Sequence, residues 1–594
     1  MERFLHTLRE RKLDRIGAAY AVAAWAVIQG ASIALPAFDA PAWVLRWLIV
    51  LAIAGLPVAL ALAWHINAGG TETARRSGLR RFLLPGALAL VVAASMVQLA
   101  LHWSRGAKAP EPARTTTLAS IAVLPFVNLS GDPAKRYFSD GIADQLITEL
   151  SRRPNLRVAA RTSSFAFAGT NQNIKTIART LNVGAVVEGS VREDGNRVRI
   201  VAELIDAGSG FQIWSQTYDR DLKNILALQA EISRAISSAL SSKLTGAAEP
   251  DEPERARPSI DPQAYRDYLQ GQFYFAQRSE EGIRRSIALF QRVNKRAPDY
   301  ADGFAALGYA HATLALNLGR TKEAAPGEAA IRKALALDPR NPQALMALTT
   351  ASLVDWKWRA AADALLKIES GDQGAPGLWH IKGLFLSYMG LTKLALPAVQ
   401  KAVQLDPLSY IDRYNLALYL LATGRKNEAV AAAREGAALQ PSNFEGQAMV
   451  CQVEAARGNF KEAHRIQLQL ASSLHVEAKL PALACAYHLA GAEHDFKTVR
   501  AIADGAASGF PGNDVGAMDI AIAYGRAGDV DKAFVWLETA FQRHEPQICA
   551  LQYTNPELKK VFADPRWKAY RDKPAFRDWE AARAEIAERF HMGE

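Results

Sequence analysis

The sequence predicts a multidomain protein with three transmembrane α-helices, an α/β domain and an all-α superhelical solenoid. Three observations predict it. Apolar stretches fill the first hundred residues, strand-like runs alternate with helical patterns in the next part, and alanines recur every 34 residues at positions 361, 395, 429 and 463. A fixed period of this length is typical of stacked helix pairs, each of which needs its neighbours for stability.

Three apolar stretches near the N-terminus predict a membrane anchor over residues 16–104. They are Ile16 to Phe38, Trp43 to Ile66 and Phe82 to Trp103. Each is long enough to cross a hydrocarbon layer of roughly 30 Å at about 1.5 Å per residue. Tryptophans at the ends of these stretches favour membrane interfaces. We therefore expect three spans in contact with a lipid bilayer.

Basic residues around these stretches predict their orientation. The first 114 residues hold 13 basic and 6 acidic residues, and most of the basic ones precede the first stretch or lie between the second and third. The positive-inside rule then places residues 1–15 in the cytoplasm and everything after Trp103 outside it. This surplus accounts for most of the net charge of +10. Because no basic stripe with interleaved aromatic residues appears, we expect no nucleic-acid partner.

Residues 118–246 alternate between strand-like and helical patterns. The expected strands are Ile121 to Val127, Arg157 to Ala160, Ala185 to Val191, Arg197 to Ile205 and Phe211 to Tyr218, and the expected helices are Tyr137 to Leu150, Ile174 to Leu181 and Ile225 to Leu244. Turn residues separate the last three strands as hairpins. A linker rich in Pro, Ala and Thr at 105–117 precedes this part, and an acidic, Pro-rich linker at 247–261 follows it. The order fits one α/β domain.

Several separated motifs give this domain a family resemblance. They are IAVLPFVNLSGD at 121–132, FSDG at 138–141, RTSSF at 161–165, VEGSVR at 187–192 and WSQTYD at 214–219. Together they resemble the TolB-like N-terminal domain, which commonly precedes tetratricopeptide (TPR) repeats in bacterial membrane proteins. The resemblance implies a multi-pass protein of the bacterial inner membrane with its C-terminal domains in the periplasm. Many relatives of this kind carry a cyclase or winged-helix domain on the cytoplasmic side, for which residues 1–15 leave no room.

The alanine period also follows the TPR skeleton. From Trp379 through Gly383 and Ala395 to Pro407, the sequence keeps the W-x2-L-G-x2-Y, A-x3-F, P pattern with Lys382 and Leu386 as departures. Small residues let paired helices pack closely, and larger apolar residues fill the contact with the next repeat. We expect seven or eight repeats over residues 262–546 and a C-terminal cap over 547–594.

The sequence lacks the usual signatures of catalysis. It contains no G-x-x-x-x-G-K-[ST] phosphate loop, H-E-x-x-H zinc helix, G-x-S-x-G elbow or C-x-x-C pair. The carboxylates that could bind a hard cation are Asp132, Asp140, Asp144, Glu188 and Asp206. Turn and helix-start positions explain most of them better, and the eleven histidines are scattered. We therefore expect no enzyme activity, no metal and no cofactor.

Three cysteines in 594 residues exclude a disulfide framework. Cys451 and Cys485 are again 34 residues apart, at the small-residue position of successive first helices. The axes of such helices should lie about 8–10 Å apart, beyond comfortable disulfide reach. The prediction is two buried apolar residues rather than a redox pair, and Cys549 receives no interpretation.

The concave face of the superhelix is the candidate binding site. In the repeat register, four positions of each first helix point into the groove. They give Met346, Thr350, Leu353, His380, Leu384, Tyr414, Leu418, Leu421 and Gln452. This mainly apolar set suits an extended peptide or a partner helix. The alternative is that the superhelix curls enough for these residues to touch one another.

These observations predict a membrane-anchored periplasmic scaffold or sensor whose TolB-like domain and TPR groove bind envelope proteins or peptides. The alternative is the regulatory subunit of a signalling system, related to cyclase-fused TolB-like/TPR proteins but lacking a catalytic domain.

Overall fold

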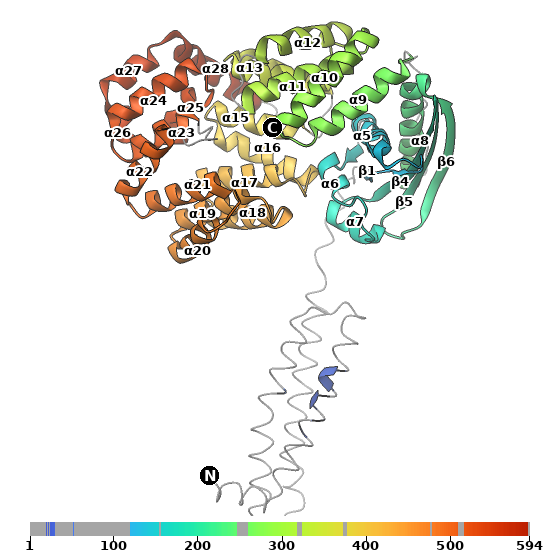
Figure 1. Cartoon of the computed structure of the whole chain (residues 1–594), viewed down its shortest axis with the longest axis horizontal. Helices are drawn as coiled ribbons and strands as arrows, with labels where there is room; N and C mark the ends of the chain where they lie inside the picture. The colour runs from blue at the N-terminus through green and yellow to red at the C-terminus, as the bar shows by residue number, and fades with distance from the viewer. Residues whose placement is uncertain are drawn as a thin grey trace, which may run out of the picture. The chain divides into compact units, whose positions relative to one another are not determined.

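The computed structural model describes residues 119–153, 156–245, 259–317, 323–371, 377–475, 478–508 and 516–591, together with eight scattered positions between 20 and 52. The described residues form a small α/β domain followed by pairs of helices (Figure 1). Of the two units into which the chain divides, Met1–Thr115 and Thr116–Glu594, the second contains nearly all of them.

The predicted membrane anchor is the part of the fold class that requires correction. Its three stretches lie outside the described residues, except for the eight scattered positions. Among the described residues, no helix is both long and apolar enough to cross a membrane. Even the 21-residue helix α8 (Ile225–Thr245) carries the charged side chains of Glu231, Arg234 and Lys243.

The three transmembrane helices are therefore removed from the fold class. Apolar length, terminal tryptophans and flanking basic residues are the grounds for predicting them, and no helix of the described residues meets the length and hydropathy that a span requires. The multi-pass inner-membrane location, with a cytoplasmic N-terminus and periplasmic C-terminal domains, rests on the same spans and is corrected with them.

The α/β domain is built on a mixed sheet. Its strands are β1 (Ala119–Val123), β2 (Val127–Asn128), β3 (Leu156–Val158), β4 (Ala185–Asp194), β5 (Arg197–Asp206) and β6 (Gln212–Asp221). Their order is β3-β1-β4-β5-β6, and β2 pairs with β4. The β1 strand is parallel to β3 and β4, whereas β4, β5 and β6 form antiparallel hairpins. The hairpins follow the predicted turns closely.

Helices cover the sheet as the alternation of side chains along β1 requires. Ile121 and Val123 pack into one cluster with residues of α5 (Arg136–Ser151) and α8. Ala122, between them, packs into another cluster with Ile177 and Leu181 of α7 (Ile174–Leu181). Successive side chains of a strand point to opposite faces, so β1 is buried on both sides.

Eight pairs of helices follow in the described part of the chain. The first helices of the pairs are α9 (Pro262–Phe275), α11 (Ala301–Asn317), α13 (Pro342–Val354), α15 (Leu378–Tyr388), α17 (Tyr410–Ala422), α19 (Phe444–Arg457), α21 (Lys479–Ala492) and α23 (Ala517–Arg526). The second helices are α10 (Glu280–Arg296), α12 (Ala324–Leu337), α14 (Trp358–Gly371), α16 (Thr392–Leu405), α18 (Lys426–Leu439), α20 (Phe460–Ala471), α22 (Phe496–Ala507) and α24 (Val530–Gln542).

The alanines that set the 34-residue period lie in four successive second helices. Ala361, Ala395, Ala429 and Ala463 all have 0% of their surface exposed. A larger side chain at these positions would force the paired helices apart. The paired helices and their shared period confirm a TPR-type repeat array.

A residue in the left-handed conformation turns the chain between the two helices of several pairs. Gly424, Gly458 and Gly528 have φ values of +81°, +89° and +78°, which glycine adopts without steric cost. Trp356 and His494 take the same conformation at equivalent turns, with φ values of +58° and +61°. The turn geometry is therefore kept even where the residue type does not favour it.

The C-terminal helices pack back onto the middle of the array (Figure 1). They are α25 (Gln547–Thr554), α26 (Lys559–Ala563), α27 (Pro565–Arg571) and α28 (Pro574–His591). The buried Trp579 donates its ring N–H to the Tyr388 carbonyl at 3.3 Å. Arg359 of α14 forms ion pairs with Asp578 at 2.7 Å and Glu585 at 2.8 Å. We call this contact the C-terminal closure.

The α/β domain shares its core with the first repeats. The cluster that contains Ile121 of β1 also contains Tyr265 and Leu269 of α9. Arg266 of α9 forms an ion pair at 2.5 Å with Glu193 of β4, which is only 5% exposed. Domain and array are thus joined by burial as well as by charge.

A second contact joins the α/β domain to the array much further along the chain. Ala160 donates its N–H to the Leu405 carbonyl at 3.1 Å. Ser163 of α6 (Arg161–Phe165) donates its hydroxyl to the Asp406 carboxylate and accepts the N–H of Leu408 at 2.8 Å. We call these five residues the Ser163 latch.

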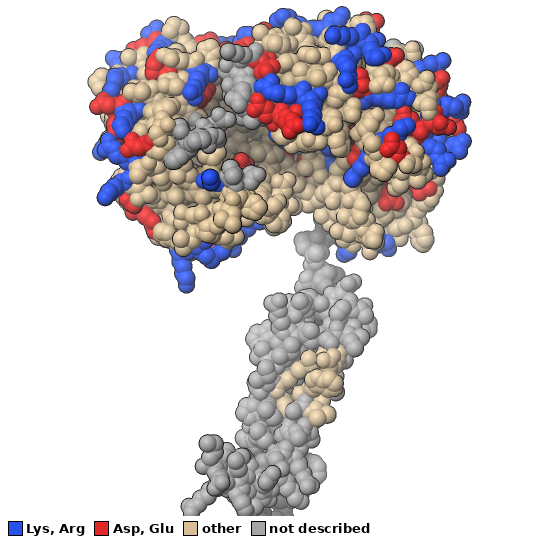
Figure 2. Space-filling model, viewed as in Figure 1, with Lys and Arg blue, Asp and Glu red and all other residues tan. Residues whose placement is uncertain are grey.

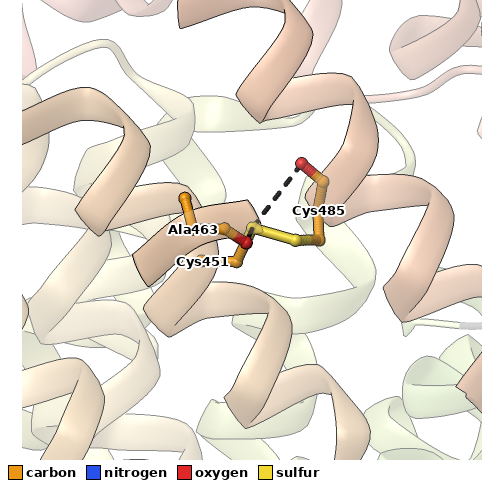
Figure 3. The surroundings of a disulfide bond; sticks show 3 residues. All are labelled: Cys451, Ala463 and Cys485. Atoms are coloured by element: carbon orange, nitrogen blue, oxygen red, sulfur yellow. Dashed lines mark hydrogen bonds between the residues drawn. A yellow bond between two sulfur atoms is a disulfide. The ribbon is translucent and has the colours of Figure 1, made fainter. Parts of the chain in front are cut away.

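A disulfide joins two successive first helices (Figure 3). Cys451 of α19 and Cys485 of α21 are fully buried, and their Cα atoms are 5.6 Å apart. The prediction of two unbonded apolar residues is wrong for a geometric reason. Each Cα lies about 2.3 Å from its helix axis, so facing residues are roughly 4–5 Å closer together than the axes.

Candidate functional site

The structure places the nine predicted groove residues in two groups. Thr350 and Leu353 are buried, with 4% and 0% of their surface exposed, and they serve the packing of the array. The other seven are partly exposed: Met346, His380, Leu384, Tyr414, Leu418, Leu421 and Gln452. These seven come from α13, α15, α17 and α19, which are four successive first helices.

His380 of this set has a partner that the sequence did not indicate. Its ring Nδ1 lies 2.6 Å from Oδ1 of Asp412, which is only 4% exposed. The backbone N–H of Asp412 is in turn capped by the Ser409 hydroxyl at 3.3 Å. The pair joins α15 to α17 and holds the imidazole of His380 in place.

Tyr414 lies where two carboxylates act on it. Burial is the main cause that raises the pKa of Tyr414 to about 12, and Glu445 and Asp519 add to the rise. Glu445 lies in the first turn of the neighbouring helix α19, whereas Asp519 belongs to the distant helix α23. The hydroxyl therefore stays protonated near neutral pH and is available as a hydrogen-bond donor.

Asp519 also acts on tyrosines of other repeats. Its carboxylate contributes to the raised pKa values of Tyr388 of α15 and of Tyr487 of α21, in both of which burial is the larger cause. Tyr388 of α15, Tyr414 of α17 and Tyr487 of α21 thus lie within electrostatic range of Asp519 of α23. The predicted register stops at Gln452, so the contributions of α21 and α23 were missed.

Asp519 keeps an exposed surface although protein surrounds it. Burial and then the nearby carboxylate of Glu545 raise its pKa to about 6. Both carboxylates approach Gly516. Glu545 accepts the N–H groups of Ala517 and Met518 at 3.0 and 2.9 Å, which caps the N-terminus of α23.

A cavity of about 720 Å³ opens at the start of α19. Its lining consists of Ser442, Asn443, Phe444, Glu445 and His475. The rings of Phe444 and His475 lie 5.6 Å apart, centroid to centroid. Figure 2 shows the array hollowed near its centre, with Lys, Arg, Asp and Glu side chains both beside the hollow and over the outer parts.

The carboxylates considered as cation ligands have local roles in the α/β domain. Asp132 accepts the N–H of Ala134 at 2.9 Å, and Asp206 accepts that of Ser209 at 2.6 Å. Asp140 and Asp144 form ion pairs with Arg136 and Arg161, each at 3.3 Å. Asp132 and Asp206 therefore lie at turns as expected, whereas Asp140 and Asp144 lie inside α5 (Arg136–Ser151) and not at its start, so the helix-start explanation is wrong for these two.

Glu188 of β4 is the fifth of these carboxylates, and it stands opposite Glu203 of β5. Burial and then Glu203 raise its pKa. Within the residues that the structure describes, no group of three or more His, Cys, Asp or Glu side chains has the arrangement of a metal site.

The family that matches the α/β domain differs from the predicted TolB-like family. The family model that matches describes the second domain of HilA/YgeH-like transcriptional regulators, over residues 117–235. The comparisons lend no support to the TolB-like assignment of the same segment. This match concerns one domain and not the whole chain.

A relative from Rhizobium meliloti (strain 1021), named putative adenylate cyclase 3, is 43% identical over 201 residues. The match covers 33% of this chain and 32% of the relative. The chain therefore spans about a third of the length of the relative that it matches.

Solved structures of TPR proteins also match. YrrB, a TPR protein described as having an unusual peptide-binding site, is 20% identical with a TM-score of 0.26, over 35% of this chain and 97% of its own. PilF of Pseudomonas aeruginosa is 18% identical with a TM-score of 0.30, over 37% and 96%. The repeat assignment is based on the helix pairs of this chain and not on these matches.

Proposed function

We propose that the chain is a protein-binding scaffold whose TPR groove receives an extended peptide segment. One observation carries the proposal: seven partly exposed side chains, mostly apolar, lie on four successive first helices. A row of this kind matches the spaced side chains of an extended or helical ligand. It offers little to a compact, highly charged ligand.

The individual side chains support the same proposal. Leu384, Leu418 and Leu421 provide apolar contact area, and Tyr414 adds a large ring with a hydroxyl that stays protonated. Aromatic anchors of this kind carry much of the binding energy at protein interfaces. The hydrogen-bonding groups of His380 and Gln452 would set the register of a bound backbone.

Peptides that the full chain selects from a random display library test this proposal, and their affinities are then measured for each variant. Tyr414→Ala should weaken the selected peptides by roughly tenfold or more, because hot-spot truncations of aromatic residues cost about 2 kcal/mol or more. His380→Ala should weaken them less, since its ring is held by Asp412. Leu468→Ala is the control, because Leu468 lies on the second helix α20 and is 66% exposed.

Circular dichroism melting separates loss of binding from loss of folding in each variant. If neither the Tyr414 variant nor the His380 variant changes the affinity, the groove is not the peptide-binding site.

A second candidate function is regulation of a nucleotide-cyclase signalling system. The relative named putative adenylate cyclase 3 favours it, since 201 residues are 43% identical. We propose that this chain lacks cyclase activity of its own and binds a separate signalling enzyme. Cyclic-nucleotide levels in cells with and without the chain test it, and turnover of ATP or GTP by the purified chain would contradict it.

A further inference from the structure

We propose that the occupant of the groove is a basic segment, whose lysine or arginine side chains are received by Glu445 and Asp519. We call these two carboxylates and the tyrosines near them the inner wall, which consists of Tyr388, Tyr410, Tyr414, Glu445, Tyr487 and Asp519. The inference rests on the proposed function and adds the chemistry of the partner to it.

The carboxylates of this wall have no cationic partner among the described residues. No lysine, arginine or histidine nitrogen of the described chain forms an ion pair with Glu445, Asp519 or Glu545. Glu445 is exposed, and among the described residues its carboxylate accepts a hydrogen bond from the Tyr410 hydroxyl at 3.5 Å. Asp519 is also exposed, and its pKa of about 6 leaves it largely ionised at neutral pH.

Two basic groups close to Tyr487 are not free to pair with Asp519, because Arg526 has a partner and His488 is neutral. Arg526 donates to Glu557 at 2.9 Å, and its guanidinium lies 5.2 Å from the centre of the Tyr487 ring. Burial and Arg526 lower the pKa of His488 to about 3, so its imidazole is uncharged. Glu445 and Asp519 therefore remain without an ion-pair partner among the described residues.

The aromatic side chains complement the same kind of ligand. Tyr410 and Tyr414 lie 6.1 Å apart, centroid to centroid, beside Glu445. An ammonium or guanidinium group over such rings gains a cation–π attraction in addition to its ion pair. The methylene stem of lysine or arginine can pack against the apolar part of the wall. The cavity of about 720 Å³ that Phe444 and Glu445 line gives room for a side chain of this length.

The overall positive charge of the chain does not itself attract a basic peptide. The net charge is +10, of which residues 1–114 contribute +7 (13 basic minus 6 acidic), so residues 115–594 carry +3 (57 minus 54) and do not attract a basic peptide by their overall charge. Affinity for such a peptide would have to come from a negatively charged region, and the inner wall is one.

Two fluorescent peptides that differ only in charge test the inference with the full chain. One alternates lysine, leucine and serine, and the other has glutamate in place of each lysine. We expect the lysine peptide to bind and the glutamate peptide not to bind. Glu445→Gln and Asp519→Asn keep the shape of the side chains, and each should weaken the lysine peptide about three- to tenfold.

The matched control is Glu462→Gln on the second helix α20. Glu462 is ion-paired with Arg465 at 2.8 Å and lies outside the groove set, so its variant should bind the lysine peptide as the unchanged chain does. Added salt should weaken the lysine peptide in the unchanged chain and have less effect in Asp519→Asn.

The pH dependence gives a further readout at Asp519. The titratable groups around it are the carboxylate of Glu545 and the hydroxyls of Tyr388, Tyr414 and Tyr487, and these hydroxyls stay protonated and uncharged near neutral pH. Because the pKa of Asp519 is raised to about 6, affinity for the lysine peptide should increase as the pH rises through 6. Asp519→Asn should lose this increase.

The outcomes separate the inference from the proposed function. Equal binding of both peptides, weakened by Tyr414→Ala but not by Glu445→Gln or Asp519→Asn, would overturn the basic partner and leave the peptide groove in place. If no peptide, including those selected from the library, binds Tyr414→Ala more weakly than the unchanged chain, both the basic partner and the peptide groove are overturned.

Discussion

At the scale of single residues, the turn glycines make separable contributions to stability. Gly424 has a φ of +81°, and a Cβ added to it would meet nothing within 4 Å. Gly491 also has open space around its Cβ position but lies within the helix α21. The two sites therefore differ in backbone conformation and not in crowding.

Alanine at these two glycines should have opposite effects. Gly424→Ala should destabilise the array by about 1 kcal/mol, because a Cβ in the left-handed region is strained. Gly491→Ala should stabilise it by about 0.5–1 kcal/mol, because alanine loses less backbone entropy in a helix. Urea denaturation followed by circular dichroism measures both, and equal shifts of the same sign would contradict the explanation.

At the scale of helices and strands, the disulfide holds two repeats together. It joins α19 to α21 across 34 residues of sequence. A cross-link over a loop of this length stabilises a fold by about 2–4 kcal/mol, mainly by restricting the unfolded chain.

Reduction should therefore lower the stability of the unchanged chain by about that amount. Cys485→Ala should melt at the same temperature with and without reductant, since its cross-link is already lost. Cys549→Ala should keep the response to reductant, because Cys549 is free. A thiol count of three in the denatured, unreduced chain would show that the bond is absent.

The elements were predictable where the signal is local. The alanine period specifies the helix pairs because each alanine packs against the first helix of its own pair, which is close in sequence. The alternation in Ile121 to Val123 specifies a strand that is buried on both faces. Contacts that depend on the curvature of the whole array were not predictable. The approach of Asp519 to Tyr388 and the bond between Cys451 and Cys485 both belong to that class.

At the scale of the whole Thr116–Glu594 unit, the Ser163 latch couples the α/β domain to the array through a buried carboxyl. Asp406 is 8% exposed. Burial is the main cause that raises its pKa to about 6; Asp412 adds to the rise, and hydrogen bonds from Ser163 and Thr162 oppose it. The docked state therefore favours protonated Asp406.

The sign of the pH dependence follows from this shift. Asp406 has a higher pKa in the folded chain than its ordinary value of 3.8, so its contribution to stability is complete below that value and is lost as the pH rises through 6. Asp406→Asn should remove this loss and be more stable than the unchanged chain at pH 7, by roughly 3 kcal/mol at most. Melting temperatures of both proteins between pH 4.5 and 7.5 measure the difference, and parallel curves would contradict it.

The C-terminal closure has a consequence for how this array can change. A straight solenoid tolerates gain or loss of a repeat, because each unit touches only the next. Here Trp579 reaches Tyr388, and Arg359 reaches Asp578, only if the helices between them span one particular arc. Duplicating or excising a repeat within that arc would carry the two halves of the contact apart, so the number of repeats is itself fixed by the geometry.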